Sequence, residues 1–303
     1  MTYFDLPGTF FVDSHISILR PNERLHPKFG LYSLVRIGFK ELESLADGVS
    51  GPIELTLGTI GEIQIPLPPL DIQHQIVTEC EAVDTEATAA RERIAAALAD
   101  MESRVEAIYA SAAPHQEIDQ LALAVQYGLS EKMNEAGIGY KIFRMNEIAQ
   151  CRMVDNGAMK CADISAEEFA KYKLNRGDVL FNRTNSIEHV GKTGLFNLEG
   201  DYCFASYLVR VVPDTGKVLP LFLTRMMNSK ALLQEARSGA ARAINQANIN
   251  ATKIRQIKIP VPPLAEQQRF VTEIEFLERA IAAAQATFAA APARKQAITP
   301  HYL

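Results

Sequence analysis

The stretch IPLPPLDIQHQIVTE at residues 65–79 has a close copy, IPVPPLAEQQRFVTE, at residues 259–273. Each copy runs from a short apolar segment through several prolines into a helical pattern. Proline fixes an extended backbone, and a polar residue after it can cap the first turn of a helix. A chain that repeats such a junction is expected to repeat the domain before it and the helix after it. The sequence therefore predicts two related domains, each followed by a long helix.

Apolar residues after both junctions recur at alternating steps of four and three, which is the heptad pattern of a coiled coil. The first helix runs from Ile76 to Ile108 with one stutter, which predicts a rod of about 40 residues. The second starts at Phe270, and Pro292 is expected to interrupt it before a last turn at 297–303. Such small apolar seams need a partner in water. An antiparallel pair within the chain is the simpler arrangement, and packing on another subunit is the alternative.

The residues between the two helices predict a compact domain of helices and strands. Alternating apolar and polar residues predict strands at 118–124, 142–148, 177–182, 194–196, 202–212 and 256–260. Ser165 and Glu168 have the spacing of a capping box, which predicts a short helix over 165–172. The spacing of apolar residues predicts a second helix over 219–237.

The first domain repeats only the back half of the second. The alignment rests on two matched pairs of segments: GTFFVDSHI (8–16) with GDYCFASYL (200–208), and HPKF (26–29) with LPLF (219–222). It predicts a strand over 8–21, a helix over 27–46 and a strand over 62–67. Nothing before Gly8 corresponds to residues 118–199, so we expect the first domain to be N-terminally truncated.

Charge is unevenly distributed along the chain, whose net charge is −5. Residues 118–258 contain 19 Lys and Arg against 14 Asp and Glu, a balance of +5. The remaining residues therefore have a balance of −10, and much of their acid lies in 71–110. A segregated basic domain is compatible with nucleic-acid binding even though the whole chain is acidic.

No catalytic motif stands out in the sequence. SIEHVGKT at 186–193 lacks the first glycine of a phosphate-binding loop and precedes a predicted strand rather than a helix. The four cysteines are far apart and form no CxxC pair, which indicates reduced thiols. No signal peptide and no membrane-spanning run is evident, so a cytoplasmic location is expected. These observations predict a non-catalytic protein.

Three loops are rich in side chains suited to DNA. Asn and Gln can pair with adenine and Arg with guanine, while Lys and Ser anchor phosphates. The candidate DNA-binding residues are Tyr127, Ser130, Lys132, Asn134, Arg144, Asn146, Asn182, Arg183, Thr184, Asn185, Lys192, Ser206, Tyr207, Arg242, Asn245, Gln246 and Asn248. The alternative explanation is that Asn, Ser and Gly simply favour turns.

Taken together, these motifs resemble the specificity (S) subunits of type I restriction–modification systems. The resemblance rests on four runs in order: QYGLSEKMNEAGIGYKIFRMNEI, GDVLFNRTNSIEHVGKTGLF, GDYCFASYLVRV and AINQANINATKIRQIKIPVPPLAEQ. It covers residues 116–303, and residues 8–110 as a half domain with its helix.

The resemblance implies an α+β fold, with mixed α/β target-recognition domains and long helices that form an antiparallel coiled-coil spacer. It divides the chain into a partial first target-recognition domain (1–64), a central conserved region with the long spacer helix (65–115), a complete second target-recognition domain (116–258), and a C-terminal conserved region with the second spacer helix (259–303). A protein of this kind is a non-catalytic subunit that recognises a bipartite DNA target and directs methyltransferase and restriction subunits to it.

The implied partners are double-stranded DNA, methyltransferase (modification) subunits and a restriction subunit, with no membrane. A second copy or a separate chain is expected to complete the first domain. No cofactor is expected in this chain, since S-adenosylmethionine, ATP and Mg would belong to partner subunits. The alternative is a protein-interaction scaffold, or a decayed or split specificity subunit, that binds partner subunits through its helices without independent DNA specificity.

Overall fold

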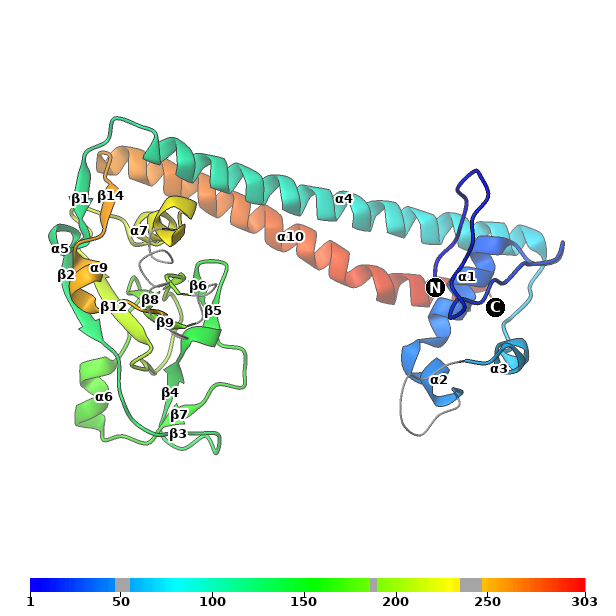
Figure 1. Cartoon of the computed structure of the whole chain (residues 1–303), viewed down its shortest axis with the longest axis horizontal. Coiled ribbons are helices and arrows are strands. Elements are labelled where there is room, and N and C mark those ends of the chain that lie inside the picture. The colour runs from blue at the N-terminus through cyan, green and yellow to red at the C-terminus, as the bar shows by residue number, and fades with distance from the viewer. Residues whose placement is uncertain (47–54, 186–189, 235–246, 303) are drawn as a thin grey trace. The chain divides into compact units, whose positions relative to one another are not determined.

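A computed structural model describes residues 1–46, 55–185, 190–234 and 247–302 (Figure 1). It contains two compact units, one made of residues 1–96 and 280–303 and the other of residues 97–279. We refer to them as unit 1 and unit 2. Both units contain parts of the long helices α4 (Leu70–Tyr109) and α10 (Leu264–Tyr302). None of the described helices is both long and apolar enough to cross a bilayer.

The long helices pack antiparallel, as the sequence predicts. In unit 1, Arg294 of α10 pairs with Glu86 of α4, and the hydroxyl of Tyr302 donates to Glu79. As α10 advances by two turns, its partner on α4 therefore moves back by two turns. The heptad positions form the buried seam: Ile76, Cys80, Val83, Ala87, Ala90, Met101 and Val105 on α4, and Phe270, Ile274, Ile281, Ala284 and Ala291 on α10.

The prediction that Pro292 interrupts the second helix is wrong, because α10 continues through it to Tyr302. A proline inside a helix removes one backbone donor and crowds the preceding turn. Here the next turn is held to α4 by the ion pairs of Arg294 with Glu86 and of Lys295 with Asp84, the second at 2.6 Å. Tertiary contacts thus outweigh the local preference of the proline.

Besides the long helices, the described residues of unit 1 form three short helices: α1 (Pro27–Ile37), α2 (Phe39–Ser44) and α3 (Leu57–Glu62). The helix expected over 27–46 is broken at Gly38, whose φ of 87° lies in the left-handed region. The strands expected over 8–21 and 62–67 are wrong. No strand forms among the described residues before His115, so neither segment has a ladder partner.

Two larger sheets form most of the globular part of unit 2 among its described residues. The six-stranded sheet has the order β2-β12-β8-β10-β6-β5, and the four-stranded sheet has the order β11-β4-β7-β3. The strands are β2 (Ala122–Tyr127), β3 (Met133–Asn134), β4 (Tyr140–Phe143), β5 (Ile148–Ala149), β6 (Arg152–Met153), β7 (Cys161–Ala162), β8 (Val179–Asn182), β10 (Thr193–Leu195), β11 (Tyr202–Phe204) and β12 (Leu208–Pro213). Fully buried aromatic rings fill the core beside the sheets, among them Phe143, Phe196 and Phe204.

The helices of unit 2 follow the prediction only in part. The expected strand over 118–124 begins as helix α5 (Ile118–Leu121) before β2. The helix expected over 219–237 is interrupted: α7 (Pro220–Met227) ends at its C-cap Asn228, and a second helical stretch covers 230–234, where the described residues end. Helix α6 (Ala166–Tyr172) starts where predicted, because the backbone N–H of Glu168 donates to Ser165 Oγ at 3.1 Å. The 3₁₀ turn η1 (Met145–Glu147) shortens the strand expected over 142–148.

The strand expected over 202–212 divides into β11 and β12, which belong to different sheets. A turn at Ala205 separates them, closed by the N–H of Leu208 on the carbonyl of Ala205 at 2.9 Å. Strand β11 pairs parallel with β4, and β12 pairs antiparallel with both β2 and β8. The turn between them is therefore the point at which the chain crosses from one sheet to the other.

The chain enters and leaves this globular part through one two-stranded sheet. Strand β1 (His115–Glu117) pairs antiparallel with β14 (Lys258–Pro260). Strand β14 is the strand predicted before the second junction. Both ends of the domain therefore lie side by side where the long helices begin and end.

A fully buried glutamine fixes the second junction. Gln267 accepts a hydrogen bond of 2.9 Å from the N–H of Leu219, and Leu219 is the N-cap of α7. Its amide nitrogen donates to the carbonyls of Lys217 at 3.0 Å and of Pro262 at 2.9 Å. One side chain thus joins the start of α10, the proline bridge and the start of α7.

The first junction repeats this arrangement with Gln73, which is also fully buried. Gln73 accepts the N–H of His26, the N-cap of α1, at 2.8 Å. Its amide nitrogen donates to the carbonyls of Arg24 at 3.0 Å and of Pro68 at 2.8 Å. The repeat seen in the sequence is therefore also a repeat of hydrogen bonds.

Candidate nucleic-acid interface

Separate segments of unit 2 converge on Arg183, directly after β8. Its guanidinium lies over the ring of Tyr127, 4.9 Å from the ring centroid. The same group donates to the carbonyl of Ser206 at 3.1 Å and, more weakly, to that of Ile249 at 3.4 Å. Arg183 thus joins the end of β2, the β11–β12 turn and the segment before α9 (Ala251–Arg255).

Backbone hydrogen bonds also hold these segments together, without the Arg183 side chain. The N–H of Arg183 donates to the carbonyl of Tyr207, and the N–H of Ile249 donates to the carbonyl of Arg183, both at 3.0 Å. The N–H of Ala251 donates to the Tyr127 hydroxyl at 2.7 Å. A site held by several bonds between rigid elements is pre-organised for a ligand.

Gly128 permits the close approach of β2 to the β11–β12 turn. A Cβ atom at this position would lie 2.2 Å from the carbonyl oxygen of Ala205. The next residue, Leu129, exchanges backbone bonds of 2.8 Å with Phe204 and Ser206. Any side chain at Gly128 would therefore push Tyr127 away from the site.

Two of the predicted DNA-binding loops, one with Thr184 and Asn185 and the other with Asn248, are joined by a short backbone ladder. Strand β9 (Thr184–Asn185) pairs antiparallel with β13 (Ala247–Asn248), so that Thr184 faces Asn248 in the register. The side chains of Asn185 and Asn248 are not described, and Arg242, Asn245 and Gln246 lie outside the described residues. The backbone pairing nevertheless brings both loops to the Arg183 site.

Three predicted residues have structural roles instead. Asn134 donates to the carbonyls of Ile138 at 2.8 Å and of Cys161 at 3.2 Å, which closes its own turn. Arg144 pairs at 2.6 Å with Glu147, whose side chain is fully buried. Asn182 is itself fully buried inside β8. The side chains of these three take part in the fold, and their contact with DNA stays a prediction.

The other predicted residues lie at the surface. Ser130, Lys132 and Asn146 are exposed, and Lys192 is partly exposed. Within the described residues, no hydrogen bond or ion pair links Ser130, Lys132 or Asn146 to Arg183. The structure therefore brings together Tyr127, Arg183, Thr184, Ser206 and Tyr207, with the backbones of Asn185 and Asn248, and leaves these surface residues apart.

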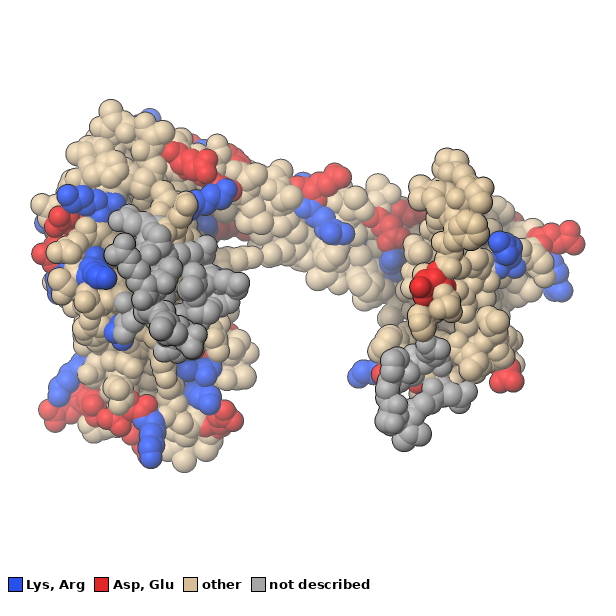
Figure 2. Space-filling model, in the orientation of Figure 1, with Lys and Arg blue, Asp and Glu red and all other residues tan. Residues whose placement is uncertain are grey.

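Acidic and basic side chains are mixed over the visible face of unit 2 (Figure 2). Most cations of the domain are neutralised by neighbours, such as Arg255 with Asp119 at 2.5 Å and Lys173 with Asp201 at 2.8 Å. Within the described part of 118–258, Lys132, Lys192 and Lys253 form no ion pair. Uncompensated cations are those best able to bind phosphate.

Sequence reasoning missed Lys253, Gly128 and the backbone of Ile249. Lys253 lies on α9, whose N-cap Asn250 accepts its N–H at 2.9 Å. Asn250 was a readable signal for this cap, because asparagine is among the preferred N-cap residues. Nothing in the sequence indicates that the helix start reaches the Tyr127 hydroxyl, because that contact joins residues 124 positions apart.

The chain offers no built metal site among its described residues, where no cluster of three or more His, Cys, Asp or Glu occurs. All four cysteines are free. Burial raises the pKa of Cys203 to about 12 and that of Cys80 to about 11, so both thiols are protonated at neutral pH.

Comparisons with known proteins point to one group of DNA-recognition proteins. The MjaX protein of Methanocaldococcus jannaschii, named as a type I restriction enzyme specificity subunit, is 33% identical over 158 residues. The alignment covers 51% of this chain and 36% of that protein. The EcoKI specificity subunit of Escherichia coli K12 is 27% identical over 162 residues, covering 52% of this chain and 34% of that protein. The chain thus spans about a third of the length of these relatives.

Among solved structures, the type I restriction-modification S subunit from M. genitalium aligns with a TM-score of 0.59 at 12% identity. The alignment covers 91% of this chain and 72% of that one, and it shows a shared fold. The family model for the type I restriction modification DNA specificity domain matches residues 1–99 and 129–287, well over half of the chain. This chain therefore belongs to the type I restriction modification DNA specificity domain family.

Proposed function

We propose that this chain recognises a short DNA sequence through the residues gathered around Arg183 in unit 2. The convergence of the β2 end, the β11–β12 turn and the β9–β13 ribbon on one arginine is the observation that carries the proposal. Arginine reads guanine edges, and asparagine reads adenine edges. Membership in a DNA specificity family supports the same conclusion.

Each part of the proposed interface has a distinct task. Tyr127 and the carbonyl of Ser206 hold the Arg183 guanidinium in one orientation, so that little side-chain entropy is lost on binding. The rings of Tyr127 and Tyr207 are 42% and 39% exposed and offer apolar contact to bases or sugars. Lys132, Lys192 and Lys253 contact phosphates, which fix register without reading sequence.

The chemistry that follows recognition belongs to other subunits in this proposal. The chain acts as a non-catalytic, cytoplasmic specificity subunit. The methyltransferase and restriction subunits carry out the reactions that use S-adenosylmethionine, ATP and Mg. In this reading residues 116–258 are the complete recognition domain, and the α4–α10 pair is the spacer on which the partners dock. Exposed rings on α10 support such docking, since Phe276 projects into solvent in unit 2 and Phe288 does so in unit 1.

Selection from random-site DNA tests the recognition proposal. The wild-type chain should enrich one motif of about 3–5 base pairs per domain and should bind less tightly as salt rises. Lys132→Ala should weaken binding equally on all sequences and reduce the log–log salt slope by about 1. Lys171→Ala is the matched control, because Lys171 is an exposed lysine already paired with Glu167. Binding without sequence preference would contradict the proposal.

Unit 1 contains a segment that has the local shape of β11–β12 without their sheets. The N–H of Ile16 donates to the carbonyl of Asp13 at 3.0 Å, which matches the Leu208–Ala205 turn in unit 2. Its apolar side chains are nonetheless exposed. Phe11 is 97% and Ile16 57% exposed, whereas their counterparts Cys203 and Leu208 are fully buried. Residues 8–21 therefore belong to no sheet among the described residues and present an apolar surface.

We propose that residues 8–21 pair with the same segment of a second copy. The counterpart strand β12 pairs antiparallel on both of its edges, and an antiparallel pair of identical strands fits a two-fold axis. Sedimentation of the full chain should then show a dimer that Phe11→Asp dissociates. Leu123→Asp, at an exposed apolar residue of unit 2, should leave the dimer intact. A monomer at every concentration would exclude the second copy and favour a separate completing chain.

A further inference from the structure

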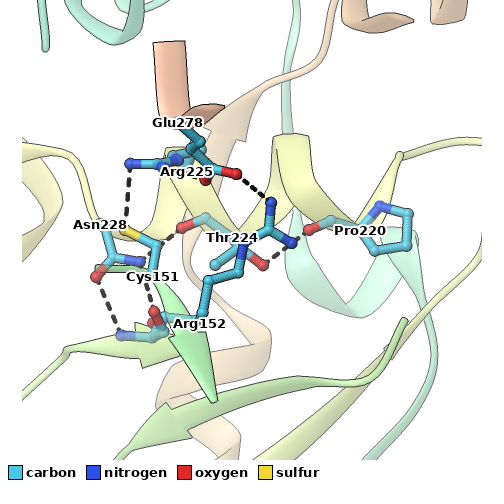
Figure 3. Close-up of polar contacts among 8 residues, drawn as sticks. Cys151, Arg152, Pro220, Thr224, Arg225, Asn228 and Glu278 are labelled. Atoms are coloured by element: carbon cyan, nitrogen blue, oxygen red, sulfur yellow. Dashed lines mark hydrogen bonds and ion pairs between the residues drawn. The ribbon is translucent and has the colours of Figure 1, made fainter. Parts of the chain in front are cut away.

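A partly buried cluster seats the recognition domain on helix α10 (Figure 3). Glu278 of α10 accepts one bond from Arg152 of β6 and one from Arg225 of α7, both at 2.5 Å. Arg225 also lies 3.6 Å from the sulfur of Cys151. One carboxylate thus holds two cations that come from different elements of the domain.

The hairpin that carries Arg152 has a strained tip. Gln150 and Cys151 have φ values of 49° and 62°, both in the left-handed region, and they join β5 to β6 as a two-residue turn. Glycine and asparagine are the usual residues there, because other side chains are disfavoured in this conformation. The contacts of Arg225 and Glu278, with the N–H of Leu195 on the carbonyl of Cys151 at 3.0 Å, hold the tip in place.

Asn228 continues this network from α7 to the sheet. Its side-chain amide pairs with both backbone groups of Thr193: it accepts the N–H at 3.0 Å and donates to the carbonyl at 2.8 Å. It also donates to the carbonyl of Thr224 on its own helix at 2.8 Å. Asn228 therefore acts as a one-residue strand partner for the first residue of β10.

Thr193, the first residue of β10, directly follows the segment that leaves β8 at Arg183. The N–H of Asn182 donates to the carbonyl of Lys192, and the N–H of Gly191 donates to the carbonyl of Asn182, each at 2.9 Å. Arg183 and Lys192 are thus the first and last residues of one loop between β8 and β10. A continuous series of contacts leads from Glu278 on α10, through Arg225 and α7, to Asn228 and Lys192.

We propose that Asn228 is a positioning residue for DNA binding, and that it fixes the returning arm of the Arg183–Lys192 loop to the α7–α10 support. The proposal rests on the proposed DNA function of this loop. Asn228 itself is not placed to touch DNA, because its amide is committed to Thr193 and Thr224. It acts by holding the lysine and the arginine at a constant separation on the sheet.

The test is a double-mutant cycle in the full chain. Asn228→Asp is nearly isosteric but directs an acceptor at two carbonyl oxygens, so it should release Thr193 and weaken DNA binding about fivefold. The loss should disappear in a Lys192→Ala background, because the positioned group is then absent. It should persist in a Lys253→Ala background, since Lys253 lies on α9 instead. Asn197→Asp, an exposed substitution of the same kind, should leave affinity unchanged.

Amide hydrogen exchange gives a second readout that needs no DNA. Asn228→Asp should accelerate exchange at Thr193, Gly191 and Asn182, while the amides of β12 keep their wild-type rates. Unchanged exchange at these three amides overturns the proposal. The proposal also fails if Asn228→Asp lowers DNA affinity by the same factor in the Lys192→Ala background as in the Lys253→Ala background. If the wild-type chain selects no DNA sequence, the proposed function fails, and the exchange data alone decide whether Asn228 positions the loop.

Discussion

The two copies of the repeat place an acidic residue at the same step of their long helices, Asp84 on α4 and Glu278 on α10. In unit 2, Glu278 binds Arg225 of the helix α7 and Arg152 of the β5–β6 hairpin. In unit 1, Asp84 binds the hydroxyl of Tyr32 on the matching helix α1 at 2.8 Å, and the second partner is Lys295 of α10 at 2.6 Å. The position of the anchor is kept while its partners change.

This difference shows which part of the repeat is the same in both units. The buried glutamine of each junction makes the same three hydrogen bonds in both units, whatever domain it carries. The acidic residue further along each long helix, Asp84 on α4 or Glu278 on α10, binds different partners in the two units. The junction is therefore the constant part of the fold, and the anchor is the part fitted to each domain.

Removing either junction glutamine should give the largest loss of stability among these changes. Gln267→Ala and Gln73→Ala each leave a buried N–H and two carbonyls without their partner, which should lower the free energy of unfolding by about 3 kcal/mol. Chemical denaturation measures the loss, with the exposed neighbours Gln268→Ala and Gln75→Ala as controls. If one glutamine proves neutral while the other does not, the junctions are not equivalent.

Neutralising the anchors should have a smaller and unequal effect. Glu278→Gln should cost about 2 kcal/mol, because Glu278 is 24% exposed and its loss leaves two arginines without a counter-charge. Asp84→Asn should cost less than about 1 kcal/mol, because Asp84 is 44% exposed and solvent screens its pairs. Denaturation at low and high salt distinguishes them, since salt should weaken only the exposed anchor. Equal losses would show that burial does not set the difference.

The smallest effect is a difference in pH response. A hydrogen bond from Lys141 is the main cause that lowers the pKa of Asp155 in unit 2, so its stabilisation is complete above the ordinary carboxylate pKa and is lost as pH falls through the lowered value. Burial, followed by the bond to Asp84, raises the pKa of Tyr32 in unit 1, so its stabilisation is lost as pH rises above about 10. Asp155→Asn should therefore reduce acid sensitivity, and Tyr32→Phe should reduce alkaline sensitivity. Unfolding free energies measured across the acid and alkaline ranges check this. The prediction fails if Asp155→Asn changes the alkaline response or Tyr32→Phe the acid response instead.

The sequence was most informative where local pattern and tertiary packing agree. Heptad spacing located both long helices and their seam, and the repeated prolines located both junctions. It was misleading where packing decides against local preference, as at Pro292, which α4 holds within a helix. It also failed over residues 8–21, whose pattern is that of a strand but which lack a ladder partner in unit 1.

The candidate site shows the same division between residue type and placement. Composition singled out Tyr127 and Arg183, which the structure brings into contact, and their binding to DNA stays a prediction. It also selected Asn134, Asn182 and Arg144, which are the same kinds of residue used for structural hydrogen bonds or buried in the fold. A single sequence does not distinguish an amide that faces solvent from one that closes its own turn.

The two-stranded sheet of β1 and β14 has an evolutionary consequence. Because His115 faces Pro260 and Glu117 faces Lys258, the chain enters and leaves the domain between these strands at one place beside the long helices. Homologous recombination at the sequences of these two strands would replace the whole intervening segment and leave both helices, with any partner bound to them, untouched. A different intervening domain could thus be acquired in a single genetic exchange, without mutation of the two helices.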